Sequence, residues 1–277
     1  MTMTETDRNS IRHLIAEATP KIGRFEAMIL LAFVLGRSKE YLIAHDDESV
    51  SELMQVKFDL YVSMRLEGMP IPYLTGEQEF FGRYFKVDQN VLIPRPDTEV
   101  LIEQAQLVAT PNASVLDLGT GSGCIAITLA AELKGAKVTA TDISSAALDI
   151  ARANAERLGY PVDFRQGSWW EAVPQNATFD LIVSNPPYIR PDDEHLKALV
   201  NEPLNALTDG DDGLSAIAEI VGKALDYLKP AGWLLVEHGY DQGPAVESIF
   251  RVSGFAAVRT VKDYGGNDRV TMGRKAN

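Results

Sequence analysis

Four consecutive residues, beginning at Asn185, combine hydrogen-bond acceptors with an aromatic ring. They follow the apolar run Phe179–Ser184, which is typical of a buried strand that ends at the edge of a sheet. Neither Pro186 nor Pro187 has a backbone N–H, so the turn offers the Asn185 side-chain oxygen and the Pro186 carbonyl as acceptors, and few donors. Tyr188 adds a flat π face. Such a turn suits a ligand that arrives as a donor, for example an –NH2 group, although a strand edge closed by an aromatic side chain would have the same sequence.

A glycine-rich loop lies upstream, between a predicted strand at 114–118 and a predicted helix that begins at Cys124. The loop consists of Gly119, Thr120, Gly121, Ser122 and Gly123. Glycines let the backbone turn tightly and approach a ligand at the edge of a sheet. The next predicted strand ends at Asp142, whose carboxylate could accept hydrogen bonds from both hydroxyls of a ribose. This order of strand, loop, helix, strand and acid predicts the binding of an adenosyl group or a dinucleotide.

The spacing of the glycines distinguishes between those two ligands. A dinucleotide loop has its third glycine three residues after the second, whereas here Gly123 comes one residue earlier. This spacing resembles the S-adenosylmethionine loop of Rossmann-like methyltransferases. After the third predicted strand comes Trp169, whose indole could stack on adenine, although both it and Trp170 could instead belong to the core.

The elements that must position these residues form a helical region followed by an α/β region. We predict helices at 11–18, 24–35, 51–66, 97–107, 124–134, 145–158, 214–228 and 244–252. We predict strands at 114–118, 137–141, 162–165, 179–184, 233–237, 256–262 and 269–273, and a hairpin in the aromatic stretch 79–87. Alternating strands and helices predict a Rossmann-like, doubly wound and mostly parallel seven-stranded sheet. The chain thus divides into a helical bundle (1–68), a linker with a β-hairpin (69–95) and a Rossmann-like domain (96–277).

The composition of the 277 residues is that of an ordinary globular protein, with 45% apolar and 23% charged residues. The net charge of −13 argues against a protein that binds duplex nucleic acid, because such proteins normally carry a basic face. A single cysteine and four scattered histidines predict neither a disulfide nor a metal site. No apolar stretch is long enough to span a membrane, and the polar start lacks the core of a signal peptide, so we expect a cytoplasmic protein.

Several longer segments resemble the release-factor glutamine methyltransferases of the HemK/PrmC type. They are Gly68–Gly76, Leu92–Glu99, Asp117–Ala126, Ser184–Ile189, Glu237–Gly239, Asp263–Gly265 and Arg269–Val270. The resemblance extends from about residue 10 to the end, and a helical N-terminal domain that recognises the partner is part of it. One departure is Asp97, where glutamate is commoner, and we leave Asp97 out of the predicted site.

The resemblance implies an enzyme that uses S-adenosylmethionine to methylate the side-chain amide nitrogen of glutamine in the Gly-Gly-Gln loop of class 1 peptide-chain release factors. The catalytic residues it implies are Asn185, Pro186 and Tyr188, and these bind substrate together with Pro187. The cofactor residues it implies are Gly119, Thr120, Gly121, Ser122, Gly123, Asp142, Trp169 and Asn185.

Two other functions are compatible with parts of the sequence. A DNA adenine methyltransferase would use the same turn on a flipped-out base, but it should have a basic surface that a chain of net charge −13 does not suggest. A binding module for S-adenosylmethionine without activity would keep the glycine loop but has little use for the acceptor turn. We therefore expect a monomeric enzyme that acts on a protein, with neither DNA nor a membrane as partner.

Overall fold

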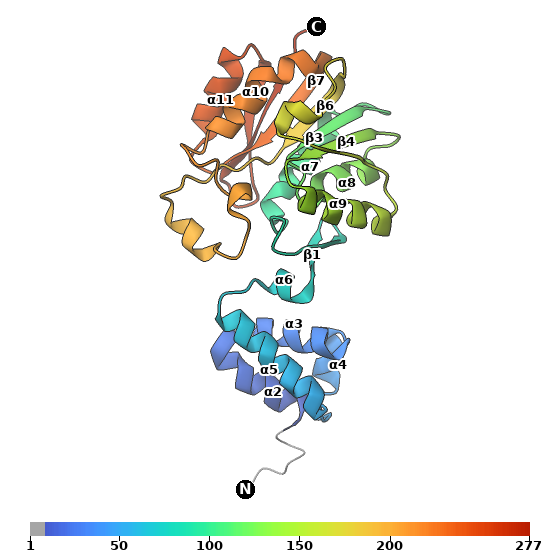
Figure 1. Ribbon diagram of the computed structural model, residues 1–277, viewed down its shortest axis with the longest axis vertical. Helices are drawn as coiled ribbons and strands as arrows, with labels where there is room; N and C mark the ends of the chain where they lie inside the picture. The colour runs from blue at the N-terminus through green and yellow to red at the C-terminus, as the bar shows by residue number, and fades with distance from the viewer. Residues whose placement is uncertain (1–8) are drawn as a thin grey trace. The chain divides into compact units, whose positions relative to one another are not determined.

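The computed structural model describes residues 9–277 and divides the chain into two compact units, Met1–Gly76 and Glu77–Asn277 (Figure 1). The division falls after residue 76 instead of the predicted 68, because the segment 69–76 packs with the bundle: Leu74 is part of its core, with Met69 and Ile71 against it. Residues 1–8 of the predicted bundle lie outside the described residues.

The first unit is helical. Its helices are α2 (Ile11–Ile22), α3 (Arg24–Leu35), α4 (Lys39–Ala44), α5 (Glu52–Leu66) and α6 (Ile71–Thr75). The two short helices were not predicted. Helix α4 is capped by Ser38, whose hydroxyl accepts a hydrogen bond from the N–H of Tyr41, and α6 has a proline in its first turn, where the missing N–H costs nothing. Both are too short for apolar periodicity to reveal them.

Part of the apolar surface of α5 does not face the core. Leu53, Val56 and Leu60 are 73%, 62% and 58% exposed, whereas Phe58 and Val62 are buried. The sequence of α5 carries apolar residues on two faces, and only one of them packs against the bundle. The other face leaves an apolar stripe exposed to solvent.

The second unit begins with an antiparallel hairpin and continues with a seven-stranded sheet. The hairpin is β1 (Glu77–Phe80) and β2 (Arg83–Lys86), and the sheet strands are β3 (Ser114–Leu118), β4 (Lys137–Asp142), β5 (Asp163–Gln166), β6 (Phe179–Ser184), β7 (Leu228–Glu237), β8 (Ala256–Lys262) and β9 (Asp268–Arg274). Their order is β5-β4-β3-β6-β7-β9-β8, parallel from β5 to β7 and antiparallel from there on. The predicted mostly parallel seven-stranded Rossmann-like fold is confirmed.

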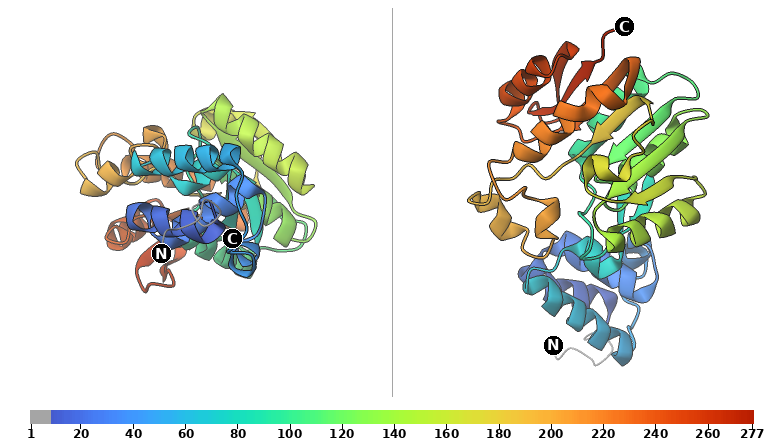
Figure 2. Two further views of the ribbon diagram at one scale, coloured as in Figure 1. Left: turned by 90° about the horizontal axis from the view of Figure 1, so that it is seen from below. Right: turned by 45° about the horizontal axis from the view of Figure 1, so that its top comes forward.

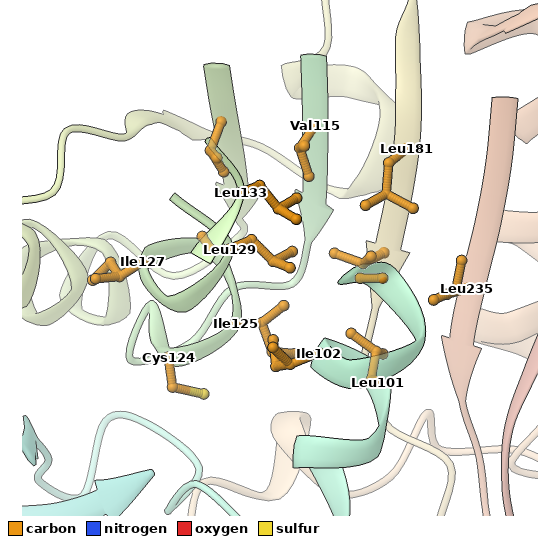
Figure 3. Packing of buried hydrophobic residues seen from close by; sticks show 14 of the residues in the cluster. Leu101, Ile102, Val115, Cys124, Ile125, Ile127, Leu129, Leu133, Leu181 and Leu235 are labelled. Carbon is orange, nitrogen blue, oxygen red and sulfur yellow. The ribbon is translucent and has the colours of Figure 1, made fainter. Parts of the chain in front are cut away.

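Helices cover both faces of this sheet (Figures 1 and 2). They are α7 (Glu99–Val108), α8 (Cys124–Glu132) and α9 (Ser145–Leu158) on one face, and α10 (Ser215–Tyr227) and α11 (Gly243–Val252) on the other. Figure 3 shows Leu101 of α7 and Leu129 of α8 packed over Val115 and Leu181 of the sheet. Because both faces are covered, the central strands are nearly all apolar, which is why they read as continuous runs.

The longest irregular connection runs from the end of β6 to the start of α10 and contains two short 3₁₀ helices, Glu194–Ala198 and Leu204–Ala206. It forms the yellow-to-orange loop in Figure 1. Among residues 9–277, no helix is both long and apolar enough to cross a membrane.

Candidate active site

Three neighbouring parallel strands place the predicted site residues at one edge of the sheet. Leu118 at the end of β3 pairs with Thr141 of β4 on one side and with Ser184 of β6 on the other. The hydroxyl of Ser184 donates to the Leu118 carbonyl at 2.7 Å, which ties β6 to β3 at this edge. The glycine loop, Asp142 and Asn185 each follow one of these strands, so they meet at the carboxyl edge where such sheets bind ligands.

A pocket of about 450 Å³ lies at this edge. Of the predicted site residues, Gly119, Thr120, Gly121, Ser122, Asp142, Trp169, Asn185 and Pro187 line it. Gly123, Pro186 and Tyr188 are not among its lining residues. The pocket also takes in residues from the segment 90–98, the connection after β6 and the first turn of α10.

The backbone N–H groups of the glycine loop are mostly occupied. Those of Gly119 and Thr120 both donate to the carbonyl of Thr141 at 2.9 Å. The N–H of Gly121 donates to Asp142 at 2.8 Å, and that of Gly123 donates within the loop. A dinucleotide site instead directs such donors at a pyrophosphate. The loop is therefore built for close approach of a ligand without a phosphate group, as expected for an adenosyl group with an amino-acid tail.

Two glycines of the loop are required by their surroundings. Gly119 has φ +76°, and a Cβ there would lie 3.1 Å from the indole of Trp169. Gly123 has φ +82°, and its Cβ would lie 2.9 Å from Ile127 and 3.1 Å from Ala151. Gly119 thus lets Trp169 close over the pocket, whereas Gly123 lets α8 and α9 approach each other, which explains why Gly123 itself does not line the pocket.

Asp142 is engaged with the backbone through both carboxylate oxygens. Oδ2 accepts from the N–H of Gly121 at 2.8 Å, and Oδ1 accepts from the N–H of Ser144 at 2.9 Å. Burial raises the pKa of Asp142, and the backbone donors only partly offset this. Each oxygen keeps a second lone pair, so the carboxylate can still accept from two ribose hydroxyls.

Asp117, on β3 two residues before the loop, is a second acid next to the glycine loop, and the sequence reasoning did not single it out. It is fully buried. Its Oδ2 accepts from the Thr120 hydroxyl at 2.7 Å, while Oδ1 has no hydrogen-bond partner among residues 9–277. Burial raises the pKa of Asp117 to about 7. A charged residue inside an otherwise apolar strand is the sequence signal that could have revealed it.

The two tryptophans after β5 have different environments. Trp169 lines the pocket and adopts an unusual φ of +41°. Trp170 is buried, donates its indole N–H to the carbonyl of Glu219 at 3.2 Å and stacks on Tyr227 with ring centroids 4.6 Å apart. Trp170 is therefore a core residue, and Trp169 is the indole that is placed to meet adenine.

The Asn-Pro-Pro-Tyr turn faces two pockets. The Nδ2 of Asn185 donates to the hydroxyl of Thr98 at 3.3 Å, which leaves the Asn185 Oδ1 as a free acceptor. Pro186 is buried. The Tyr188 hydroxyl donates to Oε1 of Glu237 at 3.3 Å, and Tyr188 lines a second pocket of about 410 Å³ next to the turn. The contact of Tyr188 with a substrate amide therefore stays a prediction.

Glu202, a buried acid in the long connection between β6 and α10, binds the segment that precedes α7. Glu202 is 6% exposed and accepts from the N–H of Ile93 at 3.2 Å and from Arg95 at 2.5 Å. Arg95 and Thr98 both line the pocket. Neither was predicted as a site residue, although both lie in the segment 92–99 on which the family resemblance partly rests.

The doubly wound sheet, the glycine loop and the two acids at its edge define an S-adenosylmethionine-dependent methyltransferase. A family model described as the methyltransferase small domain matches residues 96–213, and one described as the PrmC N-terminal domain matches residues 8–76. A solved methyltransferase from Pyrococcus furiosus has a similar fold, with a TM-score of 0.56 and 20% identity over 72% of this chain and 91% of that one.

Sequence identity with curated relatives shows the family to which the chain belongs. A release factor glutamine methyltransferase of Bordetella pertussis is 45% identical, covering 92% of this chain and 96% of the relative. That of Neisseria gonorrhoeae is 44% identical, covering 92% and 94%. The chain belongs to the release factor glutamine methyltransferase family, which confirms the predicted resemblance.

Proposed function

We propose that this enzyme transfers a methyl group from S-adenosylmethionine to the side-chain amide nitrogen of the glutamine in the Gly-Gly-Gln loop of class 1 release factors. The observation that carries the proposal is the orientation of Asn185. Its amide nitrogen is bound to Thr98, so its oxygen is the group left to accept from a substrate –NH2 at the edge of the pocket. No feature of residues 9–277 favours a DNA substrate or an inactive binding module.

The pocket fits a cationic adenosyl ligand. Gly119 has no side chain between the loop and Trp169, and Asp142 retains the acceptor capacity for a ribose. Buried Asp117, whose Oδ2 accepts from the Thr120 hydroxyl of the loop, keeps a second oxygen without a partner among residues 9–277, and a nearby cation would stabilise that carboxylate in its charged form. When bound, S-adenosylmethionine supplies a methyl group activated by the positive charge on its sulfur.

The acceptor side of the site must hold a weak nucleophile in place. The lone pair of an amide nitrogen is delocalised into the carbonyl, so orientation matters more than proton removal. Asn185 Oδ1 and the Pro186 carbonyl can accept from the two hydrogens of the glutamine –NH2 and fix its plane. Tyr188 can then face the positive charge that develops on the nitrogen, a contribution of about 0.5–2 kcal/mol. No general base is required before attack, since the proton can leave afterwards.

The N-terminal unit supplies a candidate docking surface for the folded factor. We define the α5 stripe as Leu53, Val56 and Leu60, three large apolar side chains on one face of α5 that are exposed to solvent. Large exposed apolar residues that gather on one face are typical of interaction sites. We infer that this stripe contacts the release factor, so that the intact factor binds more tightly than its isolated loop.

The proposal is tested by incubating purified release factor with enzyme and S-adenosylmethionine and mapping the product by mass spectrometry. We expect one added methyl group on the glutamine of the Gly-Gly-Gln loop, and none on a factor carrying Gly-Gly-Asn, because shortening the side chain by one methylene misplaces the nitrogen by about 1 Å and can cost a hundred-fold in rate. Methylation at another residue, or equal rates on both factors, would contradict the assignment.

A further inference from the structure

Asn154 is a fully buried polar side chain on α9, and it is not among the residues that line the two pockets. Its Nδ2 donates to the carbonyl of Ser122 at 2.9 Å and to that of Lys86 at 3.0 Å, while its Oδ1 accepts from the N–H of Lys86 at 2.7 Å. Turning the amide over would set its oxygen against two carbonyls, so these bonds fix its orientation. They join three separate segments: α9, the glycine loop and β2.

The bond to Ser122 fixes one peptide group of the glycine loop at both ends. The carbonyl of Ser122 accepts from Asn154, and the N–H of Gly123, which belongs to the same peptide group, donates to the carbonyl of Thr120 at 2.9 Å. Three of the five loop residues are glycines with positive φ, and glycine has many backbone conformations open to it. Because Ser122 and Gly121 line the first pocket, the bond from Asn154 selects the loop conformation that a ligand meets there.

The β-hairpin holds the Asn154 amide in place. Asn154 bonds to both the N–H and the carbonyl of Lys86, as a neighbouring strand would, on the edge of β2 that does not pair with β1. Two residues earlier, the carbonyl of Tyr84 accepts from Arg157 of α9. Phe85, between them, is fully buried in the core. The hairpin therefore has a fixed place against α9, and the Asn154 amide connects it to the glycine loop.

We propose that Asn154 is a positioning residue that holds the glycine loop in the conformation that binds S-adenosylmethionine. This inference rests on the proposed cofactor pocket, but not on the identity of the methylated substrate. Without the Asn154 amide, the Ser122 carbonyl loses its partner, and the cofactor must order the loop when it binds. Restricting the backbone of one residue corresponds to roughly 5- to 30-fold in an equilibrium constant, which is the expected loss of cofactor affinity.

The test is calorimetric titration of S-adenosylmethionine into full-length wild type, Asn154→Ala and Asn154→Leu. Alanine removes all three bonds, and leucine removes them while filling nearly the same space. We expect both variants to bind S-adenosylmethionine about 5- to 30-fold more weakly than the wild type. Thermal denaturation of the same samples reports folding. Wild-type affinity in either folded variant would overturn the proposal.

Two control variants separate loop positioning from a general loss of structure. Val246→Ala removes packing from a fully buried position on α11 that is not among the lining residues of the two pockets. Arg157→Met removes the bond from α9 to Tyr84 of the hairpin, and its contact with Oδ1 of Asn154 is long, at 3.4 Å. Both should bind S-adenosylmethionine within about three-fold of the wild type. A loss in either control as large as that in Asn154→Ala would overturn the proposal.

Steady-state kinetics give a second readout of positioning. A smaller fraction of folded enzyme lowers kcat and leaves KM unchanged, whereas a loosened loop raises KM for S-adenosylmethionine. We expect Asn154→Ala to raise this KM by about 5- to 30-fold and to keep kcat at saturating cofactor within about three-fold of the wild type. A lower kcat with wild-type KM would show a role in folding alone and would refute the positioning role.

A measurement on the wild type keeps the proposal testable even where the variants do not fold. Both side-chain NH2 hydrogens of Asn154 are buried and bonded, so they should exchange with solvent at least about a hundred-fold more slowly than those of exposed Asn176. Equal exchange rates would refute the proposed bonds. A wild type that binds S-adenosylmethionine but methylates no factor would refute the proposed substrate alone, whereas wild-type affinity in folded Asn154→Leu would refute the positioning role alone.

Discussion

Replacing Asp142 tests the cofactor half of the site. In Asp142→Ala the ribose hydroxyls lose a charged acceptor, and each hydrogen bond to a charged group is worth about 1.5–3 kcal/mol. Losing one such contribution corresponds to a roughly 10- to 150-fold weaker dissociation constant. The substitution also removes the bonds to the N–H groups of Gly121 and Ser144. Burial raises the pKa of this carboxyl, so removing it also relieves a desolvation cost.

The two effects on the Asp142 variant act in opposite directions on stability. Helix α9 keeps its own cap, because the hydroxyl of Ser144 accepts from the N–H of Ala147 at 3.2 Å. We therefore expect the free energy of unfolding to fall by no more than about 2 kcal/mol, and the variant should be folded at 25 °C. Asp142→Asn is the matched variant, since its amide has nearly the same shape but can accept through only one atom.

The assay is calorimetric titration of S-adenosylmethionine and of its 2′-deoxy analogue into wild type and both variants. If Asp142 holds the ribose, the wild type should prefer the normal ligand by about ten-fold, and Asp142→Ala should prefer it by less than about two-fold. Thermal denaturation of the same samples reports folding. A folded alanine variant with wild-type affinity, or one that still discriminates between the two ligands, would refute the assignment of Asp142.

Three further outcomes are expected. Asn185→Ala should reduce turnover about a hundred-fold while changing cofactor affinity much less, as single-turnover kinetics and calorimetry can show; near-normal turnover would contradict its role as acceptor. Replacing Leu53, Val56 and Leu60 by serine should raise KM for the intact factor about ten-fold or more and leave the rate on the isolated loop peptide unchanged; an equal effect on both would exclude docking by the α5 stripe. Since burial raises the folded pKa of Asp117 to about 7, stability from its protonated form is fully present below the unfolded pKa near 4 and is lost as pH rises through 7. Between pH 5 and 8 the free energy of unfolding of the cofactor-free protein should therefore fall by roughly 2–4 kcal/mol less in Asp117→Asn than in the wild type. Identical pH profiles of the two proteins would contradict the raised pKa of Asp117.

Local sequence patterns predicted the sheet and the position of the loops well. The strands were apolar runs because both faces of the sheet are covered, and the predicted end of β6 at Ser184 is the observed one. Strand β7 begins at Leu228, five residues before the predicted start, because Lys229, Pro230 and Gly232 look like a turn. Here pairing with β6 through an irregular register overrides local preference.

The parts of the site that were missed depend on contacts between distant segments. Thr98 lies 87 residues before Asn185, its hydrogen-bond partner, and Glu202 lies 107 residues after Arg95. No periodicity or turn signal connects such pairs. The buried face of α5 was likewise decided by its neighbours in the bundle, since the helix itself has apolar residues on two sides. Local chemistry thus predicted the loops, whereas packing determined which side chains support them.

The antiparallel strand β9 has a consequence for the order in which the enzyme becomes active during its synthesis. Although β9 comes after β8 in the chain, it lies inside the sheet, between β7 and β8. Glu237, at the end of β7, pairs with Val270 of β9, and the carbonyl of His238 accepts from Arg269. A nascent chain can form β3 to β6 and the glycine loop early, but the support beneath the acceptor turn is incomplete until residue 274 has left the ribosome. During its own synthesis the enzyme is thus expected to form its cofactor pocket first and the residues that support its acceptor turn last.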